Sequence, residues 1–274
     1  MVGNIHIMGV LNLTPDSFYA GSRAKADDAV PRMEALFAEG ADVVDLGACS
    51  TRPGSPQPSL EEEWGRLEPV LKEILRFAQN DKKISIDTYR SEIVRRAYEI
   101  IGPFMVNDIS GGQMDVKMLQ TVGRLGLPYV AMHMRGTPET MQSLTDYDDV
   151  VEAVKSYFKA FAVRAEDAGI TDWILDPGFG FSKTLEQNYE LLRRLDEVTS
   201  AFPEREMLVG LSRKSMVYKA LGITPEEAMP ATQIVQFKAL EKGARWLRVH
   251  DVAAAVQTAR LYSTMYTSSP GAAK

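Results

Sequence analysis

Short apolar runs rich in β-branched residues alternate with longer segments of helical periodicity along the whole chain. Each run has the length of a strand, and a helix-like segment follows it. The pattern predicts eight strands, which are His6–Leu13, Val43–Gly47, Lys83–Thr88, Phe104–Ser110, Pro128–Met134, Trp173–Gly178, Met207–Arg213 and Trp246–Asp251. Strands that alternate with helices favour a parallel sheet, because helices form the connections that parallel strands need.

The predicted helices begin and end at recognisable residues. Ser59 and Glu62 have the spacing of a capping box, and Thr224 is followed by a proline and, at the third helical position, a glutamate. Three glycines stand between a helical segment and the next strand, Gly40, Gly169 and Gly243. A glycine at this place allows the left-handed conformation that commonly ends a helix.

Eight strand–helix units in 274 residues are the inventory of a (β/α)8 barrel, which typically takes about 250 residues. A doubly wound open sheet is the rival, but it usually has fewer strands and leaves edges to protect. The Pro- and Gly-rich stretch 52–59 lies between a strand and its helix, so we interpret it as a loop of the barrel. We therefore predict an α/β fold with one (β/α)8 TIM barrel domain over residues 1–274, frayed at about 267–274.

Composition and charge exclude several classes of protein. The chain carries 31 Lys+Arg against 37 Asp+Glu, a net charge of −6, and is 45% hydrophobic. That hydrophobic content excludes a disordered chain, and the acidic balance argues against general nucleic-acid binding. No apolar run approaches the roughly 20 residues that a membrane helix needs. With the single cysteine Cys49 and no secretory signal, we expect a cytoplasmic enzyme with small-molecule substrates and neither nucleic-acid nor membrane partners.

Polar residues stand at the C-terminal ends of these strands, although buried parallel strands should be apolar throughout. They are Asn12, Asp45, Asp87, Asn107, Asp108, His133, Asp176, Ser212, Arg213, Lys214, Arg248, His250 and Asp251. An isolated aspartate after a strand is often a helix cap, but capping does not explain eight such ends together. In a barrel these ends converge on one mouth, where the active sites of the fold lie.

The residue types at this mouth suit a ligand with two parts. Asp87, Asn107 and Asp176 are acceptors for a flat ring with adjacent N–H donors, and Lys214 is a donor for another side of the ring. A cationic group suits a phosphate, and its members are Arg52, Arg213, Arg248 and His250. Asn12 offers a neutral oxygen of the kind that Mg2+ accepts together with substrate phosphates and water. These residues predict a heteroaromatic ring that carries a phosphate ester.

Other motifs say less about function. The segment Gly178–Thr184 is rich in glycine but lacks the spacing of a phosphate-binding P-loop, and the three histidines are too far apart to favour zinc. We interpret His133 as structural, and Cys49 has no partner motif that would make it a catalytic thiol.

Taken together, eight segments resemble the signature motifs of the dihydropteroate synthases, in the family's order. They are Gly9–Phe18, Asp45–Gly54, Ser85–Tyr89, Asn107–Gly112, Met132–Pro138, Asp176–Phe181, Gly210–Ser215 and Arg248–Asp251. The resemblance implies a folate-synthesis transferase that condenses 6-hydroxymethyl-7,8-dihydropterin diphosphate with 4-aminobenzoate, giving 7,8-dihydropteroate and diphosphate with Mg2+ as cofactor. Family members are usually homodimers and are targets of sulfonamides, which mimic aminobenzoate.

The family pattern also implies a role for individual residues. Asp87, Asn107, Asp176 and Lys214 would hold the pterin, Arg248 and His250 the diphosphate, and Asn12 the Mg2+. Thr51 and Arg52 would lie on a mobile loop that closes over the site, while Phe18, Pro53, Lys214 and Ser215 would border the aminobenzoate pocket and Met132 and Phe181 contact substrate. The implied catalytic residues are Lys214, Asp176, Asp87 and Arg248.

The sequence departs from the family pattern in two loops. Ala20 replaces an acidic residue in the first loop, where Asp16 is the remaining carboxylate, and Ala48 and Cys49 replace a Gly-Glu pair in the second. Two other functions stay open. A methyltetrahydrofolate-dependent methyltransferase on the same barrel would have little use for the Ser-Thr-Arg-Pro-Gly loop, and a non-catalytic pterin-binding paralogue has Ala20 as its main support.

Overall fold

Eight strands form the centre of the protein, whose computed structural model describes residues 4–13, 26–49, 57–77 and 83–266. The strands are β1 (His6–Asn12), β2 (Val43–Gly47), β3 (Lys83–Asp87), β4 (Met105–Asp108), β5 (Tyr129–Met132), β6 (Trp173–Asp176), β7 (Leu208–Val209) and β8 (Trp246–Val249). They are parallel and pair in the order β6-β5-β4-β3-β2-β1-β8-β7. A parallel bridge between Leu175 and Met207 joins β6 to β7 and closes the ring. The predicted (β/α)8 barrel is confirmed, and the open sheet is excluded.

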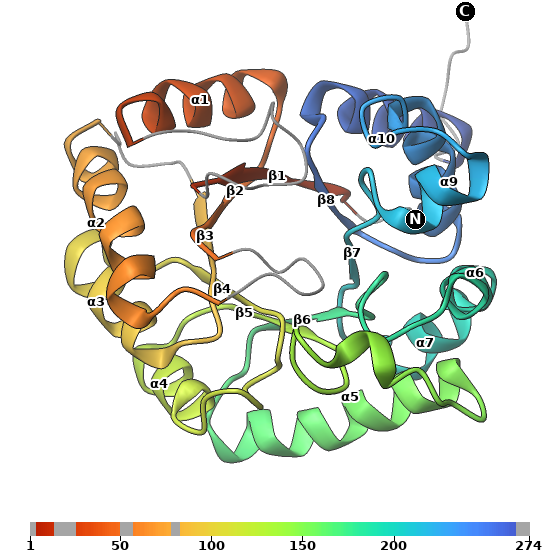
Figure 1. Cartoon of the computed structure of the whole chain (residues 1–274), viewed down its shortest axis with the longest axis horizontal. Coiled ribbons are helices and arrows are strands. Elements are labelled where there is room, and N and C mark those ends of the chain that lie inside the picture. Colours follow the sequence, from red (N-terminus) through yellow and green to blue (C-terminus); the bar gives the residue numbers. More distant parts are fainter. Residues whose placement is uncertain (1–3, 14–25, 50–56, 78–82, 267–274) are drawn as a thin grey trace, which may run out of the picture.

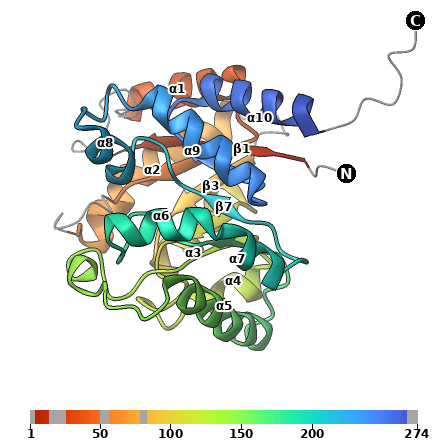
Figure 2. The same cartoon turned by 90° about the vertical axis from the view of Figure 1, so that its right-hand side faces the viewer.

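Helices form a layer outside this ring, as the view down the barrel shows (Figure 1). They are α1 (Ala26–Glu39), α2 (Leu60–Phe77), α3 (Ser91–Ile101), α4 (Met118–Leu125), α5 (Val150–Asp167), α6 (Leu185–Arg193), α7 (Leu195–Ala201), α8 (Ser215–Leu221), α9 (Met229–Glu241) and α10 (Val252–Tyr266). Two helices follow β6 and two follow β7. Figure 2, turned by 90°, shows α9 and α10 together on one side of the barrel.

Most of the predicted helix ends are confirmed. Glu62 Oε2 accepts from the backbone N–H of Ser59 at 2.7 Å, as a capping box requires, and α2 begins at the next residue. At Thr224 the predicted contact with Glu227 forms, since Glu227 Oε2 accepts from the backbone N–H of Thr224 at 2.9 Å, but the helix itself begins at Met229. The carbonyls of Pro225 and Glu226 accept hydrogen bonds from the guanidinium of Arg213, and residues 225–228 form turns that precede the helix.

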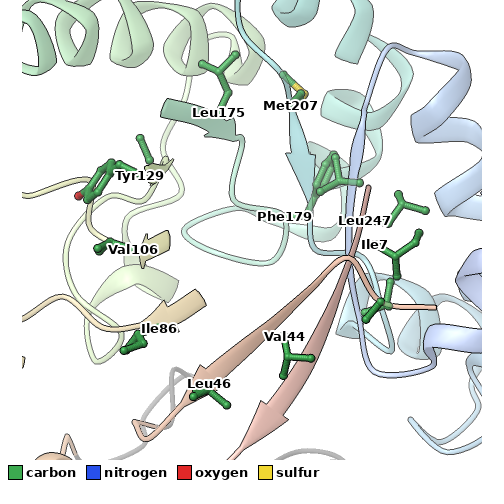
Figure 3. Close-up of a cluster of buried hydrophobic side chains, with 14 of the residues drawn as sticks. Ile7, Val44, Leu46, Ile86, Val106, Tyr129, Leu175, Phe179, Met207 and Leu247 are labelled. Atoms are coloured by element: carbon green, nitrogen blue, oxygen red, sulfur yellow. The ribbon is translucent and has the colours of Figure 1, made fainter. Parts of the chain in front are cut away.

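Alternate residues of each strand face opposite sides of the barrel wall. The outward side chains, such as Val44, Leu46 and Ile86, pack under the helices in the main core (Figure 3). A separate cluster of inward side chains fills the N-terminal end of the barrel, and it consists of Met8, Val43, Val130, Ile174, Leu208 and Trp246. This cluster closes the N-terminal end of the barrel, below the polar residues of the C-terminal mouth.

Several strands end earlier than predicted, because polar side chains begin the following loop. The carboxylate of Asp108 accepts from the backbone N–H of Ser110 at 2.7 Å and of Gly112 at 2.8 Å, which turns the chain out of β4. At β7 the paired strand is limited to Leu208–Val209, and Arg213 has a left-handed φ of 51°. Strand positions are thus confirmed, whereas the predicted C-terminal bounds were too long for every strand except β2.

Candidate active site

Side chains at the ends of four neighbouring strands lie side by side at the barrel mouth. Asn12 pairs in register with Gly47, Gly47 with Asp87, and Asp87 with Asn107. A Cβ at Gly47 would lie 3.2 Å from Asn12 Oδ1 and 3.9 Å from Asp87 Oδ2. Glycine therefore leaves a gap between these two oxygens, and a side chain there would crowd Asn12.

A buried ionic network lies directly below this row of residues. Arg248 donates through Nε to Asp45 Oδ2 at 2.7 Å and through Nη2 to Asp87 Oδ2 at 2.8 Å. Asn107 Nδ2 donates to the same Asp45 oxygen at 2.9 Å. Burial raises the pKa of Asp87 to about 7, with Arg248 opposing and Asp45 adding to the shift. Asp45 thus joins Asn107 to Arg248, and Arg248 joins both of them to Asp87.

Asp176 and Lys214 form the other polar part of the mouth. Asp176 Oδ1 accepts from the backbone N–H of Gly178 at 2.8 Å, and Lys214 Nζ donates to the carbonyl of Phe179. Burial raises the pKa of Asp176 and lowers that of Lys214 to about 8, while the charge of each opposes the shift of the other. A carboxylate and an ammonium buried so close to each other can bind the acceptor and donor atoms of one polar ring edge.

An apolar wall adjoins these charges. Lys214 Nζ lies 4.3 Å from the centroid of the Phe181 ring, which packs against a cluster that includes Ile109, Met132 and Met141. A flat ring placed here would have an apolar face beside it and polar partners at its edge, which is the usual composition of a small-molecule site. Met132 and Phe181 therefore lie where the sequence predicts substrate contacts.

His250 lies at the end of β8, next to Ser212. Its backbone N–H donates to Ser212 Oγ at 3.2 Å, and its ring Nδ1 lies 3.0 Å from the same oxygen. Because the hydroxyl accepts from the backbone, its own hydrogen is available for Nδ1, which leaves the ring proton on Nε2. Burial and the neighbouring Arg248 lower the pKa of His250 to about 4, so the ring is a neutral donor at pH 7.

Arg213 does not belong to the anion-binding group predicted for it. Its Nε and Nη2 donate to the two carboxylate oxygens of Asp251, each at 2.8 Å, and Nη1 donates to the carbonyls of Pro225 and Glu226. Asp108 likewise turns away from the mouth and accepts from the hydroxyl of Tyr129 at 2.6 Å. Asp108 is the last residue of β4, next to the inward-facing Asn107, and successive residues of a strand face opposite sides, whereas Arg213 lies beyond β7 with a left-handed φ.

Some predicted site residues lie outside the described part of the chain. Thr51 and Arg52 do, as do Phe18 and Pro53. Their described neighbours are held firmly: Arg90 donates to Glu63 and to the carbonyl of Pro58, and its Nη1 lies 3.8 Å from Cys49 Sγ. Ser215 is the first residue of α8, directly after Lys214.

Sequence reasoning missed two buried groups beside the site. It placed Asp45 at a strand end but gave it no partner, and it passed over Lys183. Lys183 Nζ lies 3.0 Å from His133 Nδ1 and donates to the carbonyls of Gly178 and Phe181 at 3.0 and 3.1 Å. Burial lowers the pKa of Lys183 to about 7. The sequence signal that could have identified Lys183 is a single lysine in a loop with two glycines that follows a strand.

Three further observations limit the chemistry. Burial, followed by Glu63, raises the pKa of the Cys49 thiol, which opposes a nucleophilic role. Among the described residues, no three His, Cys, Asp or Glu side chains are grouped so as to hold a metal ion. No helix in the described ranges is both long and apolar enough to cross a membrane.

A hollow of about 820 Å³ lies at the opposite end of the barrel. It is lined by residues at the N-terminal ends of strands, among them Lys83, Met105 and Trp246. The polar strand ends described above are not among its lining residues, so we place the chemistry at the C-terminal mouth, where the buried charges converge.

Known proteins share both the sequence and the fold. A family model described as pterin binding enzyme matches residues 8–250. Dihydropteroate synthase of Escherichia coli is 40% identical over 260 residues, which cover 93% of this chain and 90% of that protein. Dihydropteroate synthase of Thermus thermophilus, solved in complex with 4-aminobenzoate, is 39% identical with a TM-score of 0.84, and the match covers 97% of this chain and 96% of that one. The chain spans only 34% of a longer relative, the folic acid synthesis protein fol1 of Pneumocystis carinii, at 43% identity.

Proposed function

This chain belongs to the pterin-binding enzymes and, among them, to the dihydropteroate synthases of folate synthesis, and we propose how its own residues carry out that reaction. The substrates are 6-hydroxymethyl-7,8-dihydropterin diphosphate and 4-aminobenzoate, and the products are 7,8-dihydropteroate and diphosphate. The methyltransferase and the non-catalytic paralogue are not favoured, because the relatives matched over nearly the whole chain are synthases.

The observation that carries the residue assignment is the arrangement of acceptors and donors around one apolar wall. Asp176 and Asn107 accept from the N–H groups of the pterin, and Lys214 donates to its ring from the side of Phe181. Asp87 completes the acceptors at the end of β3. A carboxylate accepts two parallel hydrogen bonds from an amino-pyrimidinone edge, which gives both affinity and orientation.

The diphosphate lies toward β8 in this proposal. Two nitrogens of Arg248 are engaged with Asp45 and Asp87, and its Nη1 takes part in neither bond, so it remains a donor for an anion. His250 adds a neutral N–H donor from Nε2. Donors fixed before the reaction stabilise the charge that develops on a leaving group without having to reorganise.

The proposed reaction steps follow from these positions of the pterin and the diphosphate. The bond between the methylene carbon and oxygen breaks, and its electron pair leaves with diphosphate. The carbon's positive charge spreads into the pterin ring, where the carboxylates of Asp87 and Asp176 stabilise it. The neutral aryl amine attacks with its lone pair and then loses one proton to the departing diphosphate. Ser215 contacts the aminobenzoate in this proposal, and Thr51, Arg52, Phe18 and Pro53 have the roles that the family pattern implies.

Asn12 and its surroundings fit a divalent cation. Its Oδ1 faces the gap at Gly47, near a carboxylate oxygen of Asp87, and hard cations bind through such oxygens together with phosphate and water. Mg2+ bound there would supply Lewis-acid stabilisation of the diphosphate.

We also propose a homodimer. Ile234 on α9 is 71% exposed, and Leu261 and Met265 on the adjacent α10 are 58% and 61% exposed. Exposed apolar groups on neighbouring helices are typical of an interface between subunits. We expect Ile234→Asp to shift the protein to monomer in sedimentation equilibrium, whereas an unchanged dimer would place the interface elsewhere. The single buried cysteine supports a reducing, cytoplasmic location.

Diphosphate release tests the function directly. We expect release from the pterin diphosphate to require both 4-aminobenzoate and Mg2+, and a sulfonamide to inhibit it. Lys214→Ala and Asp176→Asn should each lower turnover by orders of magnitude while thermal unfolding shows an intact fold. Pterin binding without any release would instead identify a non-catalytic paralogue.

A further inference from the structure

Asp45 is a fully buried carboxylate whose hydrogen-bond donors, in the described part of the chain, are both residues of the substrate site. Its Oδ2 accepts from Asn107 Nδ2 at 2.9 Å and from Arg248 Nε at 2.7 Å. Its Oδ1 is buried and has no hydrogen-bond partner among the described residues. Asp45 thus bonds to no capping or turn group in this part of the chain.

Another buried aspartate shows what a purely structural carboxylate looks like in the same barrel. Asp108 accepts from the backbone of Ser110 and Gly112 and from the hydroxyl of Tyr129, so it holds its own loop. A buried ionic group such as Asp45 contributes little net stability, because its desolvation offsets the attraction between the charges. The comparison shows that Asp108 stabilises its own loop, whereas the hydrogen bonds of Asp45 go to residues of the substrate site.

The depth of Asp45 sets the direction of the Asn107 amide. Gly47, two residues further along β2, is in register with Asp87 and Asn107, so Asp45 lies one inward-facing layer below them. An ionised carboxylate only accepts hydrogen bonds, so it fixes the amide nitrogen of Asn107 downward. The amide oxygen then points away from Asp45, toward the mouth, where it can only accept.

The same carboxylate fixes the plane of the Arg248 guanidinium. With Nε bound to Asp45 and Nη2 bound to Asp87, two points of a rigid planar group are determined. The remaining nitrogen Nη1 then has a defined direction. One carboxylate thus orients an acceptor for the ring and a donor for the anion.

We propose that Asp45 is a positioning residue that makes Asn107 a hydrogen-bond acceptor for the pterin and aligns Arg248 beneath the substrate, a role that rests on the function proposed above. Asp45 does not contact substrate itself. Its contribution to activity passes through these two side chains.

A charge-swapped pair of variants tests the proposal. Asp45→Asn keeps the size of the side chain but can face Asn107 with either its oxygen or its nitrogen, so the amide is no longer fixed. We expect the Kd for the pterin diphosphate, measured by calorimetry without aminobenzoate, to rise about 10- to 100-fold. In steady-state kinetics KM for the pterin diphosphate should rise, while KM for aminobenzoate stays within about twofold of wild type.

The double variant Asp45→Asn/Asn107→Asp supplies the rescue. Here the amide nitrogen of residue 45 donates upward, and the carboxylate of residue 107 still presents an oxygen to the pterin. We expect it to recover most of the affinity, and Asn107→Asp alone, with two facing carboxylates, to bind as weakly as Asp45→Asn or more weakly. Asp108→Asn is the matched control, and it should lower the melting temperature without changing KM for the pterin diphosphate.

The outcomes separate the proposal from the assignment beneath it. Wild-type pterin affinity in Asp45→Asn, or no recovery in the swapped pair while both proteins remain folded, would overturn the role of Asp45. If Asn107→Ala also binds pterin with wild-type affinity, the assignment of Asn107 to the pterin site fails as well. If only Asn107→Ala weakens binding, that assignment holds and Asp45 is not its positioning residue.

Discussion

Removal of the Asp251 carboxylate tests whether Arg213 is a structural group or an anion ligand. The Arg213 side chain is only 6% exposed, and Asp251 holds it through two hydrogen bonds of 2.8 Å. Asp251→Ala would remove the carboxylate bound to two nitrogens of this buried guanidinium, whose Nη1 donates to the carbonyls of Pro225 and Glu226. Unpairing a fully buried charge costs about 3–5 kcal/mol, and because Asp251 is 23% exposed we reduce this to about 2–3 kcal/mol.

The assay is thermal unfolding of the variant and of the wild type, compared under the same conditions. At about 2–4 °C per kcal/mol, Asp251→Ala should lower the melting temperature by about 4–12 °C. The control is Glu99→Ala, which removes an exposed partner of Arg95 and should change stability by less than about 0.5 kcal/mol. An unchanged melting temperature in Asp251→Ala, together with weaker diphosphate binding, would refute the structural role and return Arg213 to the anion site.

Three further predictions follow from buried groups. Burial raises the pKa of Asp87 from 3.8 to about 7, so protonation of Asp87 stabilises the folded state below pH 4, and this stabilisation is lost as the pH rises through 7. In denaturant titrations, the free energy of unfolding of Asp87→Asn relative to that of the wild type should therefore rise between pH 4 and 8. A difference that does not change with pH would contradict this prediction. Lys183→Met removes the buried donor to Gly178 and Phe181, and it should cost about 1–3 kcal/mol in thermal unfolding, whereas Lys155→Met at a surface ion pair should not. Burial raises the pKa of the Cys49 thiol, so a thiol reagent at pH 8 should label the folded protein far more slowly than the protein in denaturant, and equal rates would show that the thiol is accessible.

The positions of the strands could be predicted from the sequence because buried parallel strands are nearly continuous apolar runs. The continuous apolar pattern does not show at which residue each strand ends. Met207–Arg213 is apolar at its start and polar at its end, yet its ladder pairing stops at Val209. The turn after it depends on contacts with Asp251, which is distant in the sequence. Whether the sheet closes likewise depends on a pairing between the first and last strands, β1 with β8, that no local pattern records.

The place where polar side chains gather could also be predicted, since Asp87, Asn107 and Asp176 stand in the last positions of strands and Lys214 follows one. The sequence could not predict which polar residue of a consecutive pair faces inward. Asn107 points into the barrel and Asp108 away from it, and both sides of a parallel strand are apolar, so no alternation marks the inner face. Arg213 lies beyond the paired part of β7 with a left-handed φ, so strand alternation could not give its direction either.

The charges at the mouth explain how an acidic protein can bind an anion. Net charge sums over the whole chain, which has 37 acidic and 31 basic residues, but buried charges act at short range and in low dielectric. Below the mouth the cation Arg248 lies between Asp45 and Asp87, and Lys214 lies near Asp176. The acceptors of this network suit a ring rich in N–H donors and its cations suit a diphosphate, so in the proposed function the two charge types would bind different parts of one substrate. Neutralising Asp45 or Asp87 should therefore weaken the ring's binding more than it strengthens the anion's, because each carboxylate also orients the arginine that the anion needs.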